Sequence, residues 1–132
     1  MNENFSIEIV NPEKSFLSKE NITEVVVPAF EGEIGILKDH ISIISFLKPG
    51  IIKVISGSEE ENFFVEDGIV EFKDNSLSIL TSSIFNLKHS DKNYISNTIS
   101  EAEKELSNDE IDDQKRFLLN HKIEVLKSLS IN

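Results

Sequence analysis

The chain has 132 residues, a length that fits one ordinary domain or two small ones. It contains no cysteine, which excludes a disulfide framework and a thiolate metal site. The formal net charge is −11, and affinity for phosphates comes largely from Lys and Arg. We therefore expect no nucleic acid and no anionic membrane as a direct partner.

We expect no targeting signal at the amino terminus. Residues 1–5 lack the basic and apolar regions of a signal peptide, and no later apolar run reaches the roughly 18 residues that span a bilayer. We expect a soluble cytoplasmic chain without direct membrane insertion. His40, His89 and His121 are too far apart in the sequence to form a local ligand pair, so no metal site is expected.

Residues 1–86 have the pattern of a β-rich domain. Phe5, Ile7 and Ile9 alternate with polar residues, which is the two-residue period of a half-buried strand. Turn residues at intervals of 7 to 10 predict an antiparallel β-sandwich. The further strands are expected at Ile22–Val27, Ile34–Leu37, Ile41–Leu47, Ile51–Ile55, Phe63–Val65, Ile69–Phe72, Leu77–Leu80 and Ile84–Leu87.

Residues 87–132 have a helical period instead. The first helix presents one apolar face with spacings of 4, 3 and 4: Ile95, Ile99, Ala102 and Leu106. Ser90 or Asp91 can cap its start, and Ser107 with Glu110 fits a capping box for a second helix. The second helix has a wide apolar arc: Ile111, Leu118, Leu119, Val125, Leu126 and Leu129.

The fold class is therefore predicted as α+β, an N-terminal antiparallel β-sandwich (1–86) followed by a C-terminal two-helix hairpin (87–132). A hairpin of this size is close to the limit for independent folding, so we expect it to be stable only when docked. Alternative docked states could then differ by about a few kcal/mol, which is the physical basis for a regulatory switch.

Charge is distributed unevenly along the chain. Residues 1–86 have 6 basic and 15 acidic side chains, whereas residues 87–132 have 7 and 9. Within residues 114–132 four cations stand against one acid: Lys115, Arg116, Lys122 and Lys127 against Glu124. These cations either solubilise an amphipathic helix or dock on an acidic protein surface, because Leu119, Ile123 and Leu126 widen the apolar arc beside them.

The most specific segment is Glu31–His40, which reads Glu-Gly-Glu-Ile-Gly-Ile-Leu-Lys-Asp-His. Acidic neighbours and the lack of a Gly-Lys-Ser/Thr ending exclude a phosphate-binding loop. Gly32 and Gly35 predict a tight turn with positive φ, and the turn can also be an exposed acidic tip that contacts another protein.

Glu33, Asp39 and His40 could be drawn as a general acid/base set. No nucleophile, oxyanion hole or pocket accompanies them in the sequence, so His40 is expected to form hydrogen bonds that close the loop. The run Glu59–Glu61 is expected to be a solvated hairpin tip.

Together with Lys48-Pro49-Gly50 and Glu66–Glu71, this segment resembles the amino-terminal domain of the epsilon subunit of the F-type, proton-translocating ATP synthase. The resemblance runs from about residue 5 to residue 106. It implies a non-catalytic subunit of the central stalk, whose sandwich binds the gamma subunit and whose loop end rests on the c-subunit ring. By resemblance, the ring-facing loop comprises Glu31, Gly32, Glu33, Asp39 and His40.

The resemblance also implies a role for the hairpin. In this family the second helix can meet the alpha and beta catalytic subunits and oppose ATP hydrolysis, which assigns inhibitory contacts to Lys115, Arg116, Lys122 and Lys127. Some members bind ATP through a first-helix motif that Asp91 matches, but Tyr94 stands at its Arg position. Ile99 and Ser100 stand where further basic residues are expected, so we expect no ATP and no cofactor here.

The leading hypothesis is a rotor and regulatory subunit of the ATP synthase, peripheral on the cytoplasmic face of the bacterial inner membrane. Two alternatives remain open from the residues alone. The chain could be a free-standing adaptor or ligand-binding β-sandwich with an accessory hairpin, or a small acid/base enzyme that uses Glu33 and His40.

Overall fold

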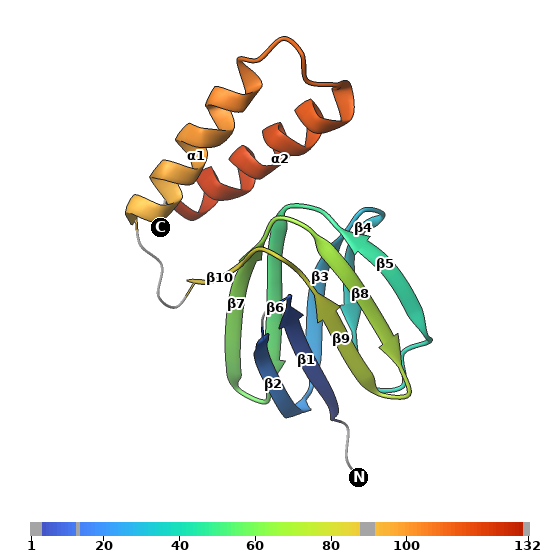
Figure 1. Ribbon diagram of the computed structural model, residues 1–132. Helices are drawn as coiled ribbons and strands as arrows, with labels where there is room; N and C mark the ends of the chain where they lie inside the picture. The colour runs from blue at the N-terminus through green and yellow to red at the C-terminus, as the bar shows by residue number, and fades with distance from the viewer. Residues whose placement is uncertain (1–3, 13, 88–91, 131–132) are drawn as a thin grey trace. The chain divides into compact units, whose positions relative to one another are not determined.

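The computed structural model describes residues 4–12, 14–87 and 92–130. The chain divides into two compact units, residues 1–88 and 89–132, and the first consists of strands and the second of helices (Figure 1). This confirms the predicted fold class. The elements are β1 (Phe5–Asn11), β2 (Lys14–Ile22), β3 (Glu24–Ala29), β4 (Gly32–Ile36), β5 (Ile43–Leu47), β6 (Gly50–Ser56), β7 (Glu59–Val65), β8 (Gly68–Lys73), β9 (Ser76–Leu80), β10 (Ile84–Asn86), α1 (Lys92–Leu106) and α2 (Asp113–Ser130).

Hydrogen bonding joins the strands in the order β10-β7-β6-β3-β5-β8-β9-β1-β2, and β4 pairs with β3. Strand β3 connects the two halves of this strand order. Its first residues pair with β6, and its last residue, Ala29, pairs with Leu47 of β5. The described pairs are antiparallel except β1 with β9, which run parallel. No turn connects β1 to β9, so turn spacing carries no signal for this pair.

The core of the sandwich follows from the alternation along its strands. Phe5, Ile7 and Ile9 of β1 are buried, as their two-residue period predicts. The ring of Phe5 meets the ring of Phe72 edge to face, with 5.5 Å between centroids. Each large apolar side chain buried in this way contributes roughly 1.5–3 kcal/mol, so the sandwich has an extensive core of its own.

Most of β2 was not predicted, and its last residue, Ile22, was expected in the strand that follows. Ile22 ends β2, and the chain turns at Asn21 (φ 64°) and Thr23 before β3 begins. Phe16 and Leu17 are adjacent and both half-buried, and the register of β1 with β2 shifts between Ile9 and Val10. A bulge of this kind removes the strict alternation from which a strand is recognised.

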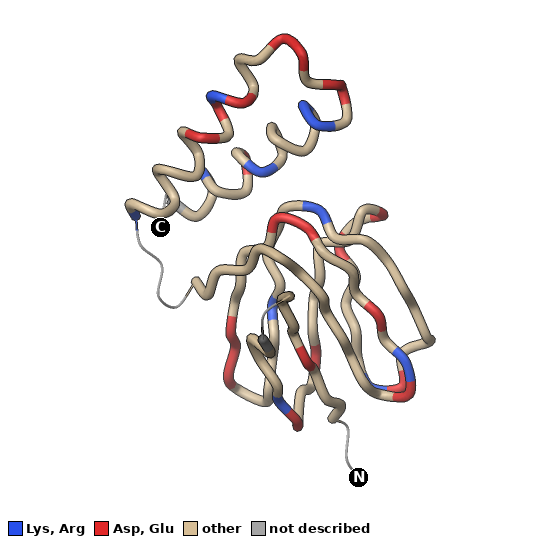
Figure 2. The backbone as a smooth tube through the Cα atoms, viewed as in Figure 1, with Lys and Arg blue, Asp and Glu red and all other residues tan. Residues whose placement is uncertain are grey.

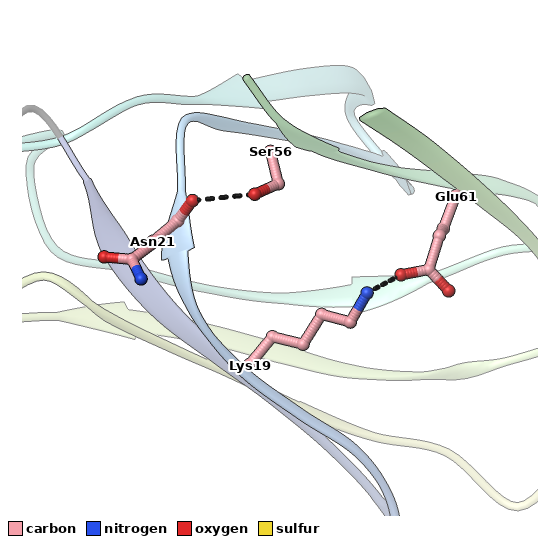
Figure 3. A network of polar contacts seen from close by, with 4 residues as sticks. All are labelled: Lys19, Asn21, Ser56 and Glu61. Atoms are coloured by element: carbon pink, nitrogen blue, oxygen red, sulfur yellow. Dashed lines mark hydrogen bonds and ion pairs between the residues drawn. The ribbon is translucent and has the colours of Figure 1, made fainter. Parts of the chain in front are cut away.

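The corner between β2 and β3 is held against the turn between β6 and β7 (Figure 3). The Oγ atom of Ser56 donates to the carbonyl of Asn21 over 3.0 Å, and Lys19 forms an ion pair with Glu61. The predicted hairpin tip Glu59–Glu61 is instead the start of β7. Glu59 and Glu60 are exposed there, and Glu61 ties β7 to β2.

The hairpin is capped differently from the prediction. The Oγ atom of Ser107 donates to the carbonyl of Lys104 over 2.6 Å at the end of α1, whereas Asp112 begins α2 by accepting the backbone N–H of Lys115 over 2.7 Å. The predicted Ser107–Glu110 capping box is therefore wrong. Ile111 precedes α2, although it packs against the hairpin core of Ala102, Leu119 and Ile123. Ser90 and Asp91 lie outside the described residues.

Candidate interaction surfaces

Three segments that the sequence singled out gather at one end of the sandwich, at the top in Figure 1. They are the turns Phe30–Glu31, Lys48–Pro49 and Glu66–Asp67, which we call the motif end. The pairs Ala29–Gly32, Ala29–Leu47 and Leu47–Gly68 join these turns side by side. The motif thus describes one surface built from three loops.

Backbone geometry explains two glycines of the motif end. Gly68 has φ +151°, and a Cβ atom there would lie 2.7 Å from the carbonyl oxygen of Leu80. At Gly50 a Cβ atom would lie 2.5 Å from the Cβ atom of Pro28. Gly35, predicted as part of the turn, lies within β4 instead, so only Gly32 of the pair takes the positive φ that was expected.

The motif end presents an anchored carboxylate. Both carboxylate oxygens of Glu31 accept from the Oγ atom of Ser45, over 2.8 and 2.7 Å. Glu31 is nonetheless exposed, and Glu33 is exposed two residues later on β4. A donor on a partner protein can therefore reach a carboxylate whose position is already set by β5.

Asp39 and His40 do not lie at the motif end. They follow β4 and meet the β8–β9 turn, where the backbone N–H of Asp39 donates to the Oδ1 atom of Asn75 over 2.7 Å. The expectation that Glu31 to His40 form one ring-facing loop is corrected on this point. Glu33 is separated from Asp39 by the remaining length of β4, roughly 10 Å of strand, so Glu33, Asp39 and His40 do not assemble an acid/base set.

His40 contributes to its loop as expected, but not alone. Its backbone N–H donates to the carbonyl of Leu37 over 3.1 Å, and its Nδ1 atom lies 2.7 Å from the carbonyl of Ile41. The ring also contacts Phe72 edge to face. The longer-range closure is made by Asp39 with Asn75.

The outer face of the sandwich carries exposed apolar side chains that the sequence analysis did not mark. Phe30 lies beside Phe46, Phe46 pairs with Ile69, and Ile69 pairs with Leu80, so the four form one row from the β3–β4 turn across β5, β8 and β9. We call these four residues the apolar row. Phe46 is 65% exposed, and Ile44 on the same face of β5 is 71% exposed. The available signal was that β5 is apolar on both faces, which alternation toward one core does not require.

Figure 2 marks the cations along α2 in blue. Two of them have contacts within the hairpin. The Nζ atom of Lys115 lies 3.4 Å from a carboxylate oxygen of Glu105, and a guanidinium nitrogen of Arg116 donates to the carbonyl of Leu106 over 3.3 Å. Lys122 is half-buried and Lys127 is exposed. Two of the four predicted inhibitory residues therefore also hold the end of α1.

The apolar arc beside these cations needs a correction. Leu119 and Ile123 are buried and pack against Ala102 of α1. They form the hairpin's own core and do not widen an open docking arc. The large apolar side chain that α2 does expose is Phe117, which is 58% exposed and stacks on His121.

The remaining candidates concern ligands and the membrane. Of the residues compared with an ATP motif, Ile99 packs against the hairpin core, Ser100 is exposed, and Asp91 lies outside the described residues. Among the described residues, His, Asp and Glu form no cluster suited to a metal ion. No helix within residues 92–130 is long and apolar enough to cross a membrane.

Comparisons with known proteins agree with this arrangement. Residues 4–87 match the family described as "ATP synthase, Delta/Epsilon chain, beta-sandwich domain". The chain is 68% identical over 130 residues to the ATP synthase epsilon chain of Pelagibacter ubique, covering 98% of this chain and 100% of that one. It is 34% identical to the epsilon chain of Rhizobium etli strain CIAT 652, covering 92% and 89%.

A solved structure shares the fold of the whole chain. A chain in the Euglena gracilis mitochondrial ATP synthase, in the assembly of OSCP, F1 and c-ring, aligns with a TM-score of 0.76 at 19% identity, covering 99% of this chain and 81% of that one. Because the family model matches more than half of the chain and the 68% identical relative is matched over its full length, this chain belongs to the epsilon-chain family of the ATP synthases.

Proposed function

We propose that this chain is a non-catalytic rotor subunit of the F-type ATP synthase, which couples the gamma subunit to the c ring during proton-driven ATP synthesis and opposes ATP hydrolysis through its C-terminal helices. The observation that carries the proposal is the 68% identity to an epsilon chain, which extends over both the sandwich and the hairpin. The separation of Glu33 from His40 supports a binding role, because it leaves the acid/base alternative without an assembled site.

The apolar row is our candidate for the gamma-binding surface. Phe46 is 65% exposed and its neighbours across the sheet, Phe30 and Ile69, are 43% and 37% exposed. A contiguous apolar sheet face of this kind gains roughly 25 cal/mol for each Å² that a partner covers. Acidic side chains such as Glu71 border the row, so a partner surface with an apolar centre and basic rim would fit it.

The Glu31–Glu33 turn is our candidate for the ring contact. Ser45 holds the carboxylate of Glu31 in place, and Glu33 remains exposed. Preformed acceptors lose little conformational entropy when a donor arrives, which favours a contact that must persist during rotation. Asp39 and His40 lie at the other end of β4 and are not included in this contact.

The hairpin is our candidate for regulation. Its cations would meet acidic surfaces of the alpha and beta subunits; Lys115 and Lys127 are exposed, and Arg116 and Lys122 are half-buried. Lys115 and Arg116 first have to exchange their contacts with Glu105 and Leu106 for contacts with the partner. The subunit would act on the cytoplasmic face of the bacterial inner membrane, as a peripheral part of the complex.

Co-purification tests the proposal. A tagged chain is recovered from its native membranes, and the proteins that accompany it are identified; gamma, c, alpha and beta subunits are expected. The double variant Phe46→Ser/Ile69→Ser should lose gamma and everything attached through it. The matched control is Phe117→Ser, which removes a similarly exposed ring from α2 and should leave gamma bound.

A second arm addresses the ring. The variant Glu31→Gln/Glu33→Gln should retain gamma and the fold but recover less of the c subunit. Recovery of the wild-type chain alone would contradict the assigned surfaces. Recovery of all subunits by the Phe46→Ser/Ile69→Ser variant, at the wild-type level, would contradict them as well. Capture of unrelated proteins alone would favour the free-standing adaptor.

A further inference from the structure

The loop between β4 and β5, residues 37–42, exposes two large apolar side chains. Ile41 is 77% exposed and Leu37 is 57% exposed. Exposed apolar groups on a flexible loop would lose conformational freedom on binding, which lowers affinity. The contacts of this loop therefore decide whether it can serve as a binding surface.

Asp39 and Asn75 join this loop to the β8–β9 turn by two reciprocal hydrogen bonds. The backbone N–H of Asp39 donates to the Oδ1 atom of Asn75 over 2.7 Å, and the Nδ2 atom of Asn75 donates to the Oδ1 atom of Asp39 over 2.9 Å. We call this pair the Asp39–Asn75 clamp. It connects residues 36 positions apart, so it fixes the loop to a different hairpin.

The clamp joins two segments whose backbone adopts unfavourable φ angles. Asp39 has φ 66°, Asp74 has φ 50° and Asn75 has φ 57°. This left-handed region is unfavourable for residues with a Cβ atom, although Asp and Asn tolerate it better than most. A conformation with this cost persists when surrounding contacts determine it, and it is often found at binding sites.

The position of the loop indicates its partner. Ile41 lies three residues before Ile44, and the exposed face of β5 continues through Ile44 and Phe46 into the apolar row. The Glu31–Glu33 turn, where the ring contact is proposed, lies beyond the opposite end of β5. A protein that covers the apolar row can extend along the exposed face of β5 through Ile44 to Ile41, whereas a contact limited to the Glu31–Glu33 turn does not reach this loop.

We propose that the Asp39–Asn75 clamp pre-organises residues 37–42 so that Leu37 and Ile41 extend the surface that binds the gamma subunit. Asp39 and Asn75 are positioning residues in this scheme, and the contacts are made by Leu37 and Ile41. The inference rests on the proposed function, because it takes gamma as the occupant of the apolar row.

The pair offers a charge exchange as its test. Asn75→Asp places two carboxylates against each other and removes the side-chain donor, so the loop should be released. Asp39→Asn keeps an oxygen that can accept from Asn75. The double variant Asp39→Asn/Asn75→Asp restores a donor at position 39 and an acceptor at position 75, so it should restore the loop.

Affinity of the purified full-length chain for purified gamma is measured by titration calorimetry, with melting temperature as the control for folding. Asn75→Asp should weaken binding by about tenfold, since loop ordering then occurs on binding, whereas Asp39→Asn and the double variant should stay within about threefold of wild type. Ile41→Ser should weaken binding in the wild-type chain but add little in the Asn75→Asp background. If Asn75→Asp only affected the stability of the fold, the effects of the two substitutions on the binding free energy would add.

Three results distinguish a failure of the proposed function from a failure of the clamp. No binding of gamma by the wild-type chain would contradict the proposed function itself. Wild-type binding with an unaltered affinity for Asn75→Asp would overturn the clamp. If Asn75→Asp fails to fold, Ile41→Ser decides alone: its side chain is 77% exposed, so it should fold, and an unchanged affinity would overturn the inference.

Discussion

The sandwich and the hairpin differ in how much of their own chain stabilises them. The sandwich core includes the fully buried rings of Phe63 and Phe72, whereas the buried side chains of the two helices are aliphatic and fewer: Ile95, Ala102, Leu119, Ile123 and Leu126 among the described residues. A small two-helix unit buries too little surface to be strongly stable alone. The comparison indicates a rigid body that carries binding surfaces and a marginal element whose state a partner can change.

The two units can be destabilised separately through their cores. Phe72→Ala should destabilise the sandwich by about 3–5 kcal/mol, because it removes a buried ring and leaves a cavity. Leu119→Ala should destabilise the hairpin by about 2–5 kcal/mol without moving the sandwich transition. Tyr94 is the only tyrosine and the chain has no tryptophan, so tyrosine fluorescence follows α1 while circular dichroism at a β-sheet wavelength follows the sandwich.

In the wild-type chain the fluorescence transition should then occur at a lower urea concentration than the β-sheet transition. A single coincident transition for both probes, shifted equally by Phe72→Ala and Leu119→Ala, would mean that the two units unfold as one.

Gly68 and Gly57 both have positive φ but differ in how closely other atoms surround them. Gly68→Ala should cost the sandwich about 3 kcal/mol, because the added Cβ atom would meet the backbone of Leu80 and φ is +151°. Gly57→Ala should cost about 1 kcal/mol, since φ is +62° but the surrounding space is open. Urea unfolding of both variants measures the difference, and equal costs would show that crowding at Gly68 is relieved by local movement.

These glycines illustrate what the sequence could predict. Asp67-Gly68 and Pro49-Gly50 indicated turns from residue type alone, and the alternation of Phe5, Ile7 and Ile9 indicated a core-facing strand. Such signals are local in the chain. The sequence therefore predicted most strands, both helices and the order of the two units.

The missed features depend on contacts that are distant in the chain. The parallel pairing of β1 with β9 has no connecting turn, and the clamp joins Asp39 to Asn75. Glu31 and His40 lie at opposite ends of the sandwich because β4 is extended between them. The glycines at 32 and 35 had instead indicated a single turn. The second helix is capped by Asp112 and not by the predicted capping box; four candidate capping residues occur within six positions, Ser107, Asn108, Asp109 and Asp112, so residue type alone does not select one.

The start of α2 provides a smaller test of the hairpin. Asp112→Ala removes the carboxylate that accepts from the N–H of Lys115, and it should destabilise the hairpin by about 1 kcal/mol. Asp109→Ala, in the same connection and exposed, is the matched control and should change little. Hydrogen exchange of amides in α1 and α2 measures the effect, and protection of the sandwich strands should stay constant. Faster exchange in β1 or β8 would show that the hairpin cap supports the sandwich as well.

The smallest expected effect on stability separates the two roles of Lys115. Its ion pair with Glu105 is exposed, at 56% and 51% of the two side chains, and should contribute no more than about 0.5 kcal/mol, less at high salt. Lys115→Gln and Glu105→Gln break the same pair, so both should shift the tyrosine transition equally.

Only Lys115→Gln removes a cation that could meet the catalytic subunits. If the proposed inhibition uses this residue, ATP hydrolysis by the assembled enzyme should rise with Lys115→Gln and stay constant or fall with Glu105→Gln, which frees the ammonium for docking. Equal rates for the two variants would assign Lys115 to the hairpin alone and leave regulation to the other cations of α2.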